Sequence, residues 1–170
     1  MSVAVYPGSF DPITYGHLDI LDRATKVFDH VVIGVLANPR KSPLLAVEER
    51  MRVIRESVAA DGGAAAEAMA GDRISIVAFD GLTVDLCHAH GATAIVRGLR
   101  AISDFEIEMQ LAHNNRVLAP DVDTVFFMTS IDHGYVSSSL VKEIATFGGD
   151  VSAMLPEPAA ETLKAALGRR

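Results

Sequence analysis

Short apolar segments alternate along the chain with longer segments in which apolar residues recur at helical spacing. The short segments are rich in β-branched and aromatic residues, a composition typical of parallel strands that are buried on both faces. They lie at 3–6, 31–37, 74–79, 93–96 and 124–128. We therefore expect five parallel strands separated by helices.

Two of the longer segments carry an apolar stripe of the kind that an amphipathic helix presents on one face. The stripes consist of Leu18, Leu21, Ala24 and Phe28 in the first segment and Val47, Met51, Ile54 and Val58 in the second. A third helix is predicted over 82–90, where Gly91 would form the C-terminal cap.

Two further helices are predicted in the second half of the chain. Ser103 and Glu106 have the spacing of a capping box, which predicts a helix that begins there and runs to about Leu118. The other helix is expected to begin near Ser138 and to end at the two glycines at 148–149.

Five repeats of strand and helix predict a doubly wound, Rossmann-like α/β fold of one domain spanning 1–170. We expect a parallel five-stranded sheet in the order 3-2-1-4-5, with C-terminal helices. The tail at 151–170 is predicted to be helical, to be broken by Pro156 and Pro158, and to pack on the outside. The Ala- and Gly-rich segment 59–72 lies between a helix and a strand, and its centre is predicted to be a surface excursion without a catalytic role.

Composition and charge exclude several classes of protein. An apolar share of 49% and a mean hydropathy of +0.26 exclude a disordered chain. No apolar run reaches the roughly 18 residues of a membrane span, and 1–6 contains no basic residue, so we expect a soluble, cytoplasmic protein that does not bind membranes. A formal net charge of −7 argues against a broad nucleic-acid surface, although local cations can still bind a small phosphorylated ligand. The single cysteine, Cys87, excludes an internal disulfide and a four-cysteine zinc site, and we expect it to be a small buried hydrophobe.

Polar residues gather after the predicted strands, where open α/β sheets bind their ligands. Gly8 and Ser9 follow the first strand, and Gly16 and His17 stand at the start of the next helix. Backbone amides at a helix start favour an anion, and an imidazole there can donate a hydrogen bond to a phosphate oxygen. Alternatively, His17 only caps the helix.

The same residues carry a family resemblance. Thr14-x-Gly16-His17 resembles the HxGH motif of the nucleotidyltransferase superfamily, with Thr in place of the first His. Together with Tyr-Pro-Gly-Ser-Phe-Asp-Pro at 6–12, it resembles the bacterial phosphopantetheine adenylyltransferases. The resemblance extends from Val5 to Pro158, and its further motifs are Arg-Gly-Leu-Arg at 97–100, Asp-Phe-Glu-x-Glu-Met-Gln-Leu-Ala at 104–112 and Val-Ser-Ser-Ser-Leu-Val-Lys-Glu at 136–143.

The resemblance implies transfer of the adenylyl group of ATP to 4′-phosphopantetheine, which gives 3′-dephospho-coenzyme A and pyrophosphate. Coenzyme A itself is a candidate feedback inhibitor. The motifs contain no nucleophile with a base beside it, which favours direct in-line attack by the substrate phosphate over a covalent enzyme intermediate. Asp104, Glu106 and Glu108 lack metal-ligand spacing, so we expect no protein-bound metal and expect Mg²⁺ to arrive with ATP, held by phosphates and water.

The resemblance also implies roles for individual residues. The implied catalytic residues are His17 and Lys41. The implied ATP-binding residues are Ser9, Phe10, His17, Gly98, Leu99, Arg100, Glu108, His133, Gly134, Tyr135, Val136, Ser137, Ser138 and Ser139. The implied residues that bind the acceptor substrate are Ser9, Lys41, Thr83 and Arg97.

Several of these residues have a structural alternative. Arg97 and Arg100 could belong to a solvated turn, and Lys41 could be a solubility charge on a loop between two prolines. Glu108 could be a solvated helical carboxylate, and Thr83 could cap a helix.

The serines and the lysine that follows them also remain open to two interpretations. One serine of 137–139 is expected to be an N-cap. The role of Lys142 stays open between a solvated charge and a functional one.

The resemblance implies a homohexamer, and the pattern of the helix at 103–118 is compatible with one. We expect Ile107, Leu111 and Leu118 to pack on the sheet, while Met109, Ala112 and Asn115 point elsewhere and offer an interface. Packing by the C-terminal tail is the alternative.

The sequence departs from the family pattern in two places, of which the first is the Ala- and Gly-rich segment at about 60–72, which is longer than expected and touches no motif. The segment 131–135 also departs from the family pattern, so its contacts with the adenine base stay open.

Two other functions also remain: a related adenylyl- or cytidylyltransferase that makes NAD or an activated alcohol, and a nucleotide-binding sensor without turnover. Thr14 argues against the first, and the presence of His17, Lys41 and both arginines argues against the second.

Overall fold

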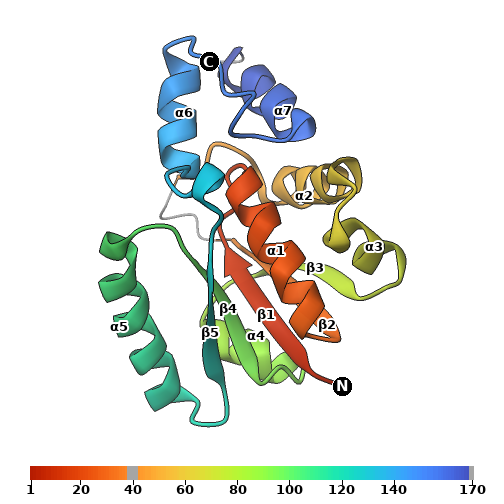
Figure 1. The fold of residues 1–170 in the computed structure, drawn as a ribbon, viewed down its shortest axis with the longest axis vertical. Helices are drawn as coiled ribbons and strands as arrows, with labels where there is room; N and C mark the ends of the chain where they lie inside the picture. The colour runs from red at the N-terminus through yellow and green to blue at the C-terminus, as the bar shows by residue number, and fades with distance from the viewer. Residues whose placement is uncertain (38–41, 169–170) are drawn as a thin grey trace.

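The computed structural model describes residues 1–37 and 42–168 and contains a parallel sheet whose strand order is β3-β2-β1-β4-β5 (Figure 1). This order and the doubly wound α/β class agree with the prediction. The strands are β1 (Val3–Gly8), β2 (His30–Leu36), β3 (Ile74–Phe79), β4 (Ala94–Leu99) and β5 (Asp123–Met128).

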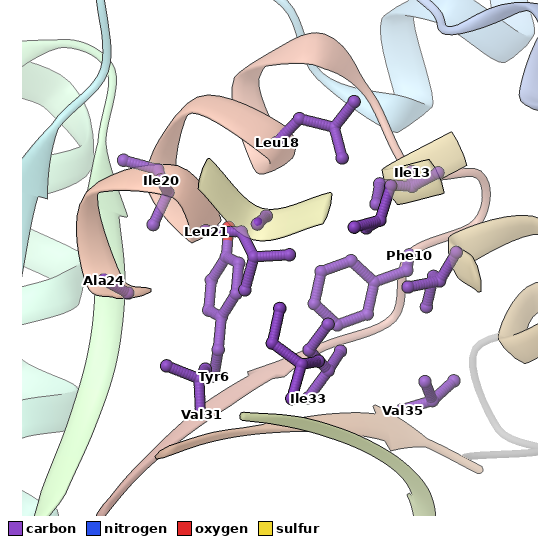
Figure 2. Close-up of a cluster of buried hydrophobic side chains, with 14 of the residues drawn as sticks. Tyr6, Phe10, Ile13, Leu18, Ile20, Leu21, Ala24, Val31, Ile33 and Val35 are labelled. Carbon is purple, nitrogen blue, oxygen red and sulfur yellow. The ribbon is translucent and has the colours of Figure 1, made fainter. Parts of the chain in front are cut away.

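Side chains that alternate along the central strands build a separate core on each face of the sheet. Tyr6 and Ile33 belong to one core, whereas Val5 and Val32 belong to the other. The first core also contains residues of α1 (Tyr15–Val27), α2 (Val47–Asp61) and α3 (Ala64–Ala70). Figure 2 shows part of it, with Phe10, Leu18 and other apolar side chains enclosed between α1 and the sheet.

The second core is smaller and lies under α4 (Thr83–Ala89). Cys87 is fully buried there, which confirms the prediction. Gly91 follows the end of α4 with a φ of 63°, the left-handed conformation that a glycine after a helix supplies. None of the described helices is long and apolar enough to span a membrane.

The C-terminal helices α6 (Ser138–Thr146) and α7 (Glu157–Gly168) lie at the top of Figure 1, beyond the carboxyl ends of the strands. α7 packs against α2 and α6. The prediction that two prolines break this tail is wrong in one respect. Pro156 precedes α7 and Pro158 is its second residue, a place where a missing N–H group costs no helical hydrogen bond.

The segment 59–72 is not the surface excursion that its composition predicts. It contains the end of α2 and all of α3, and Ala65 and Ala68 are buried. Asp22 Oδ1 accepts a hydrogen bond of 2.7 Å from the N–H group of Ala65 at the start of α3. Alanine side chains are small, so they allow α3 to lie close to α1 rather than loop away from it.

α5 (Ile102–Leu118) differs from its prediction in two ways. Ala101 is the N-cap residue, so Ser103 lies inside the helix and the predicted capping box does not begin it. The side chains of Ile107, Leu111 and Leu118 are exposed instead of packing on the sheet. Helical spacing shows which residues share a face but not whether another element covers that face. In Figure 1, α5 stands at one side of the sheet, beside the edge strand β5.

Candidate active site

A cavity of about 520 Å³ opens at the carboxyl ends of β1 and β4, where the strand order reverses. This is the point at which open α/β sheets bind ligands. The predicted site residues that line it are Ser9, Phe10, His17, Thr83, Arg97, Gly98, Arg100, Glu108, Val136, Ser137 and Ser138. Thus residues from both halves of the chain meet in one cavity.

The other predicted site residues do not line the cavity wall. Leu99 is buried, whereas Tyr135 and Ser139 are exposed, and His133 and Gly134 lie in the turn before α6. Their contacts with ATP stay predictions. Lys41 lies outside the described residues.

His17 is held in place by reciprocal capping of α1. Its backbone N–H donates to Thr14 Oγ1 at 3.3 Å, and its Nδ1 accepts a hydrogen bond of 3.0 Å from the N–H group of Thr14. The alternative that His17 only caps the helix therefore holds for Nδ1. The other nitrogen, Nε2, takes no part in the cap, and the residue lines the cavity.

The cap also determines the protonation state of the His17 ring. A backbone N–H group can only donate, so Nδ1 has no proton and the neutral ring carries its proton on Nε2. Burial, together with the positive charges of Arg100 and Arg97, lowers the pKa of His17 to about 4. At neutral pH, the ring therefore offers an uncharged N–H donor to a ligand.

The loop between β1 and α1 keeps an uncommon backbone conformation. Phe10 has a φ of 46°, in the left-handed region, and its ring is buried in the first core. A Cβ atom on Gly8 would lie 2.9 Å from that ring, so glycine is needed there. The loop therefore depends on core packing for its shape.

Buried Arg50 of α2 supports the same loop, a role that the sequence did not indicate. Its Nη1 donates to the carbonyl oxygens of Ser9 at 2.6 Å and Leu36 at 3.0 Å, and its Nε donates to that of Leu45 at 3.1 Å. One guanidinium thus joins the ends of β1 and β2. The sequence signal is weak, since Arg50 looks like any charged position of an amphipathic helix.

Arg97 and Glu108, predicted to bind different ligands, are paired with each other. Arg97 Nε donates to Glu108 Oε2 at 2.6 Å, and Arg97 Nη2 donates to the other carboxylate oxygen. Arg97 Nη1 also donates to the carbonyl oxygen of Pro7 at 3.3 Å. Glu108 is therefore not a solvated carboxylate: it orients a guanidinium on the cavity wall.

Arg100 makes a second arginine–carboxylate pair on this side of the cavity. It binds Asp104 through two nitrogens, at 3.0 and 3.2 Å, and donates to the carbonyl oxygen of Val136 at 3.1 Å. Arg100 thereby ties the start of α5 to the segment before α6.

The three successive serines differ in their contacts. Ser137 is the N-cap of α6, as predicted for one of them, and its Oγ accepts from the N–H group of Leu140 at 3.2 Å. Ser138 Oγ donates to the carbonyl oxygen of Pro12 at 2.8 Å. A hydroxyl has one proton, so Ser137 keeps its own for a ligand whereas Ser138 has used its proton on the protein.

Thr83 is the first residue of α4, and Leu82 is the N-cap without a side-chain capping bond. The capping alternative for Thr83 is therefore not observed. Near the divergent segment 131–135, the His133 ring stacks on Tyr15, with centroids 5.6 Å apart and planes at 23°.

Comparison with known proteins places the chain in a family. A model of the cytidylyltransferase-like family matches residues 5–144. The phosphopantetheine adenylyltransferase of Lachnoclostridium phytofermentans is 51% identical over 156 residues, which cover 92% of this chain and 90% of the relative. That of a Roseiflexus species is 48% identical over 170 residues, the whole of both chains. The chain belongs to the phosphopantetheine adenylyltransferase family.

Solved structures agree with this family at the level of the fold. A putative nicotinate-nucleotide adenylyltransferase from Vibrio parahaemolyticus has a TM-score of 0.65, at 14% identity, over 100% of this chain and 97% of that one. The nicotinic acid mononucleotide adenylyltransferase of Plasmodium falciparum has a TM-score of 0.67, also at 14% identity, over 99% and 95%. At this identity, the likeness shows a shared α/β architecture.

Within 1–37 and 42–168, no group of three or more His, Cys, Asp or Glu side chains could hold an ion. Asp104 and Glu108, the carboxylates on the cavity wall, are already paired with arginines.

Proposed function

We propose that this protein transfers the adenylyl group of ATP to 4′-phosphopantetheine, giving 3′-dephospho-coenzyme A and pyrophosphate. Relatives that are named phosphopantetheine adenylyltransferase are similar to this chain over nearly its whole length, which supports the proposed reaction. For this chain, the observation that carries the proposal is the neutral His17 ring, which keeps an N–H donor for a cavity that also contains Arg97 and Arg100.

The proposed reaction is an in-line displacement. An oxygen of the acceptor's phosphate attacks the α-phosphorus of ATP, and the bond from that phosphorus to the oxygen shared with the β-phosphate breaks. The electron pair of that bond leaves with pyrophosphate, and no covalent enzyme intermediate forms. Catalysis then rests on positioning and on stabilising the charge of the transition state.

Within this reaction, His17 Nε2 would donate to a non-bridging oxygen of the α-phosphate. A positioned donor of this kind lowers the barrier by about 3 kcal/mol. The hydroxyl group of Ser137 and the backbone N–H groups at the start of α6 would donate hydrogen bonds to the β- and γ-phosphates. Lys41 keeps its proposed catalytic role from the family resemblance.

The acceptor would bind on the side of Arg97. A smaller cavity of about 90 Å³ shares Pro7, Thr83, Arg97 and Glu108 with the main one and continues toward α5. Its walls contain both apolar and polar side chains, which suits the methylene and amide groups of a pantetheine arm, and Arg97 suits the phosphate of that arm. Coenzyme A carries the same arm, so it remains our candidate feedback inhibitor.

We further propose that Mg²⁺ enters with ATP, held by phosphate and water oxygens. The arginine pairs of Asp104 and Glu108 support this arrangement over an ion held by the protein. When bound, the ion would neutralise charge on the transferred and departing phosphates. The cytoplasmic location stays a prediction.

A homohexamer is our proposal for the assembly, and the exposure of α5 supports it. Phe105, Ile107, Leu111, Val117 and Leu118 are all exposed on one helix, a concentration of apolar side chains typical of an interface. Closed symmetry with three-fold and two-fold contacts would give six subunits. Light scattering after size exclusion should give a mass near six times 18.1 kDa, and a monomer at micromolar concentration would contradict the proposal.

A pyrophosphate-release assay tests the proposed reaction. Purified protein with ATP, Mg²⁺ and 4′-phosphopantetheine should release pyrophosphate, and mass spectrometry should detect dephospho-coenzyme A. Nicotinamide mononucleotide in place of 4′-phosphopantetheine is the control for the related NAD-forming activity. Turnover with that acceptor alone would support the alternative enzyme, and no turnover with either would support a binding protein.

A further inference from the structure

An ion pair between a buried carboxylate and a half-buried lysine joins two segments that both line the cavity, and neither of its residues was assigned a role by the motifs. Lys142 Nζ of α6 donates to Asp11 Oδ2 at 2.6 Å. Asp11 lies in the loop between β1 and α1, 131 residues away in the chain, and is only 4% exposed. The open question about Lys142 is therefore answered: it is not a solvated charge.

Asp11 has further donors, which make it a junction of three segments. Its carboxylate oxygens accept hydrogen bonds of 2.9 Å from the N–H groups of Leu44 and of Leu45, just before α2. Burial alone would raise the pKa of Asp11, but the hydrogen bonds from Lys142, Leu44 and Leu45 outweigh it and hold the pKa below its usual value. Asp11 therefore stays ionised at neutral pH.

A second contact runs beside the ion pair. Ser138, one turn before Lys142 on α6, donates through Oγ to the carbonyl oxygen of Pro12. Adjacent residues of the loop, Asp11 and Pro12, are thus bound by α6 residues four positions apart, which lie on the same helix face. Two contacts at different points hold the helix against the loop in one orientation.

Both segments joined in this way form the wall of the cavity. Ser9, Phe10 and Thr14 line it from the loop, and Ser137 and Ser138 line it from α6. A triphosphate chain that contacts His17 and the start of α6 must bridge the two segments. Its binding requires them to be at a defined separation, because charged hydrogen bonds weaken steeply outside their narrow distance range.

We propose that Asp11 and Lys142 are positioning residues that set the separation between the β1–α1 loop and α6 for the triphosphate of ATP. This inference rests on the proposed function for the identity of its ligand. The pair acts through the segments that it joins. Its loss should therefore weaken binding of the nucleotide triphosphate and leave the acceptor side, around Arg97 and Thr83, unchanged.

The main test is the double variant Asp11→Asn/Lys142→Met, because it removes both charges together. Removing Lys142 alone would leave the buried Asp11 carboxylate without its ion-pair partner, which destabilises a protein far more than removing both charges. We expect the double variant to be folded by circular dichroism, with a KM for ATP at least tenfold higher and a KM for 4′-phosphopantetheine within twofold of wild type. The single variant Lys142→Arg keeps the positive charge, so its KM for ATP should be lower than that of the double variant.

Lys164→Met is the matched control, since it removes a lysine charge from an exposed position of α7. It should change neither KM. A purely structural role for the pair predicts a lower melting temperature with unchanged KM values in the folded fraction. An ATP KM within twofold of wild type in the double variant overturns the inference.

Calorimetric titration with adenosine 5′-(α,β-methylene)triphosphate separates this inference from the proposed reaction. The analogue cannot transfer its adenylyl group, so its binding needs no acceptor and no turnover. A wild-type protein that fails to turn over in the pyrophosphate assay refutes the proposed function, whereas equal affinity of wild type and double variant for the analogue refutes the role of the pair.

Discussion

On one side of the cavity, the loop that leads to His17 rests on buried residues, whereas on the other side α5 exposes most of its apolar side chains. Phe10, Ile13 and Leu18 are at most 3% exposed, but Ile107 is 62% exposed. Buried Arg50 and the Asp11–Lys142 pair support the His17 side. On the other side, α5 is joined to β4 by the Arg97–Glu108 pair and to the segment just before the helix by the Arg100–Asp104 pair.

This difference separates two tasks of the site. Close packing fixes atoms tightly, which suits a donor that must meet the transition state at a defined point. Ion pairs on a weakly covered helix can rearrange at lower cost, which suits the recognition of a ligand that must enter and leave. The comparison therefore predicts unequal effects of similar substitutions on the two sides.

The largest expected difference is in stability. Leu21→Ala, in the first core, should lower the free energy of unfolding by about 2 to 5 kcal/mol because it leaves a cavity. Leu118→Ala, on exposed α5, should change it by less than about 0.5 kcal/mol in the isolated chain. Urea denaturation at several protein concentrations checks both, since an effect of Leu118→Ala that grows with concentration would place this residue in an assembly contact. If both variants lost the same free energy of unfolding at low protein concentration, the two sides of the cavity would not differ in packing.

The next effect is on catalysis. His17→Asn replaces the ring by an amide whose oxygen can still accept from the N–H group of Thr14, but it removes the distal donor. We expect kcat to fall by about 100-fold or more, with little change in either KM, because the interaction is made mainly in the transition state. Steady-state kinetics measure this, and His90→Ala, at an exposed position, is the control. A kcat within about threefold of wild type would exclude this role for His17.

A third prediction concerns pH. The pKa of His17 is about 4 in the folded protein against 6.5 for an unperturbed histidine, so the unfolded chain binds more protons between these values. Stability should therefore fall as the pH drops from 6.5 toward 4, by up to about 1.4 kcal/mol for each pH unit from this residue alone. Unfolding of wild type and His17→Asn across this range checks the sign. Parallel pH profiles for the two proteins would show that His17 does not cause the fall.

The smallest effect is expected on the α5 side. Glu108→Gln keeps a hydrogen-bond acceptor for Arg97 but removes the charge that orients the guanidinium. We expect the KM for 4′-phosphopantetheine to rise by about fivefold and kcat to change by less than twofold. Glu106→Gln, at an exposed position of the same helix, should leave both parameters unchanged. A loss of kcat as large as that of His17→Asn would show that both sides are equally demanding.

Local pattern predicted much of the fold. The apolar strand segments, the stripes of α1 and α2 and the glycine after α4 depend on neighbouring residues, and the structure contains each of them. Two strands are longer than predicted: β1 continues to Gly8 and β4 to Leu99, so Gly8 and Arg97 lie inside strands that were expected to end before them. The order 3-2-1-4-5 followed from the doubly wound arrangement that five strand–helix repeats predict. The predictions failed where they had to say whether a residue is buried or exposed. The alanines of α3 are buried although a surface excursion was predicted, and the apolar side chains of α5 are exposed although they were predicted to pack on the sheet.

Hydrophobic periodicity and turn residues act over a few positions, so the strands, the helices around them and the segments that converge at the end of the sheet could be predicted from the residues alone. The pairing of side chains there could not be predicted in the same way, because it depends on contacts between segments that are far apart in the chain. Asp11 meets Lys142, and Arg97 binds Glu108, because folding brings distant segments together and buries charges that must then find partners. The same is true of His17: the motif indicates an imidazole at a helix start, but its neutral ring with a proton on Nε2 results from burial and from the N–H group of Thr14.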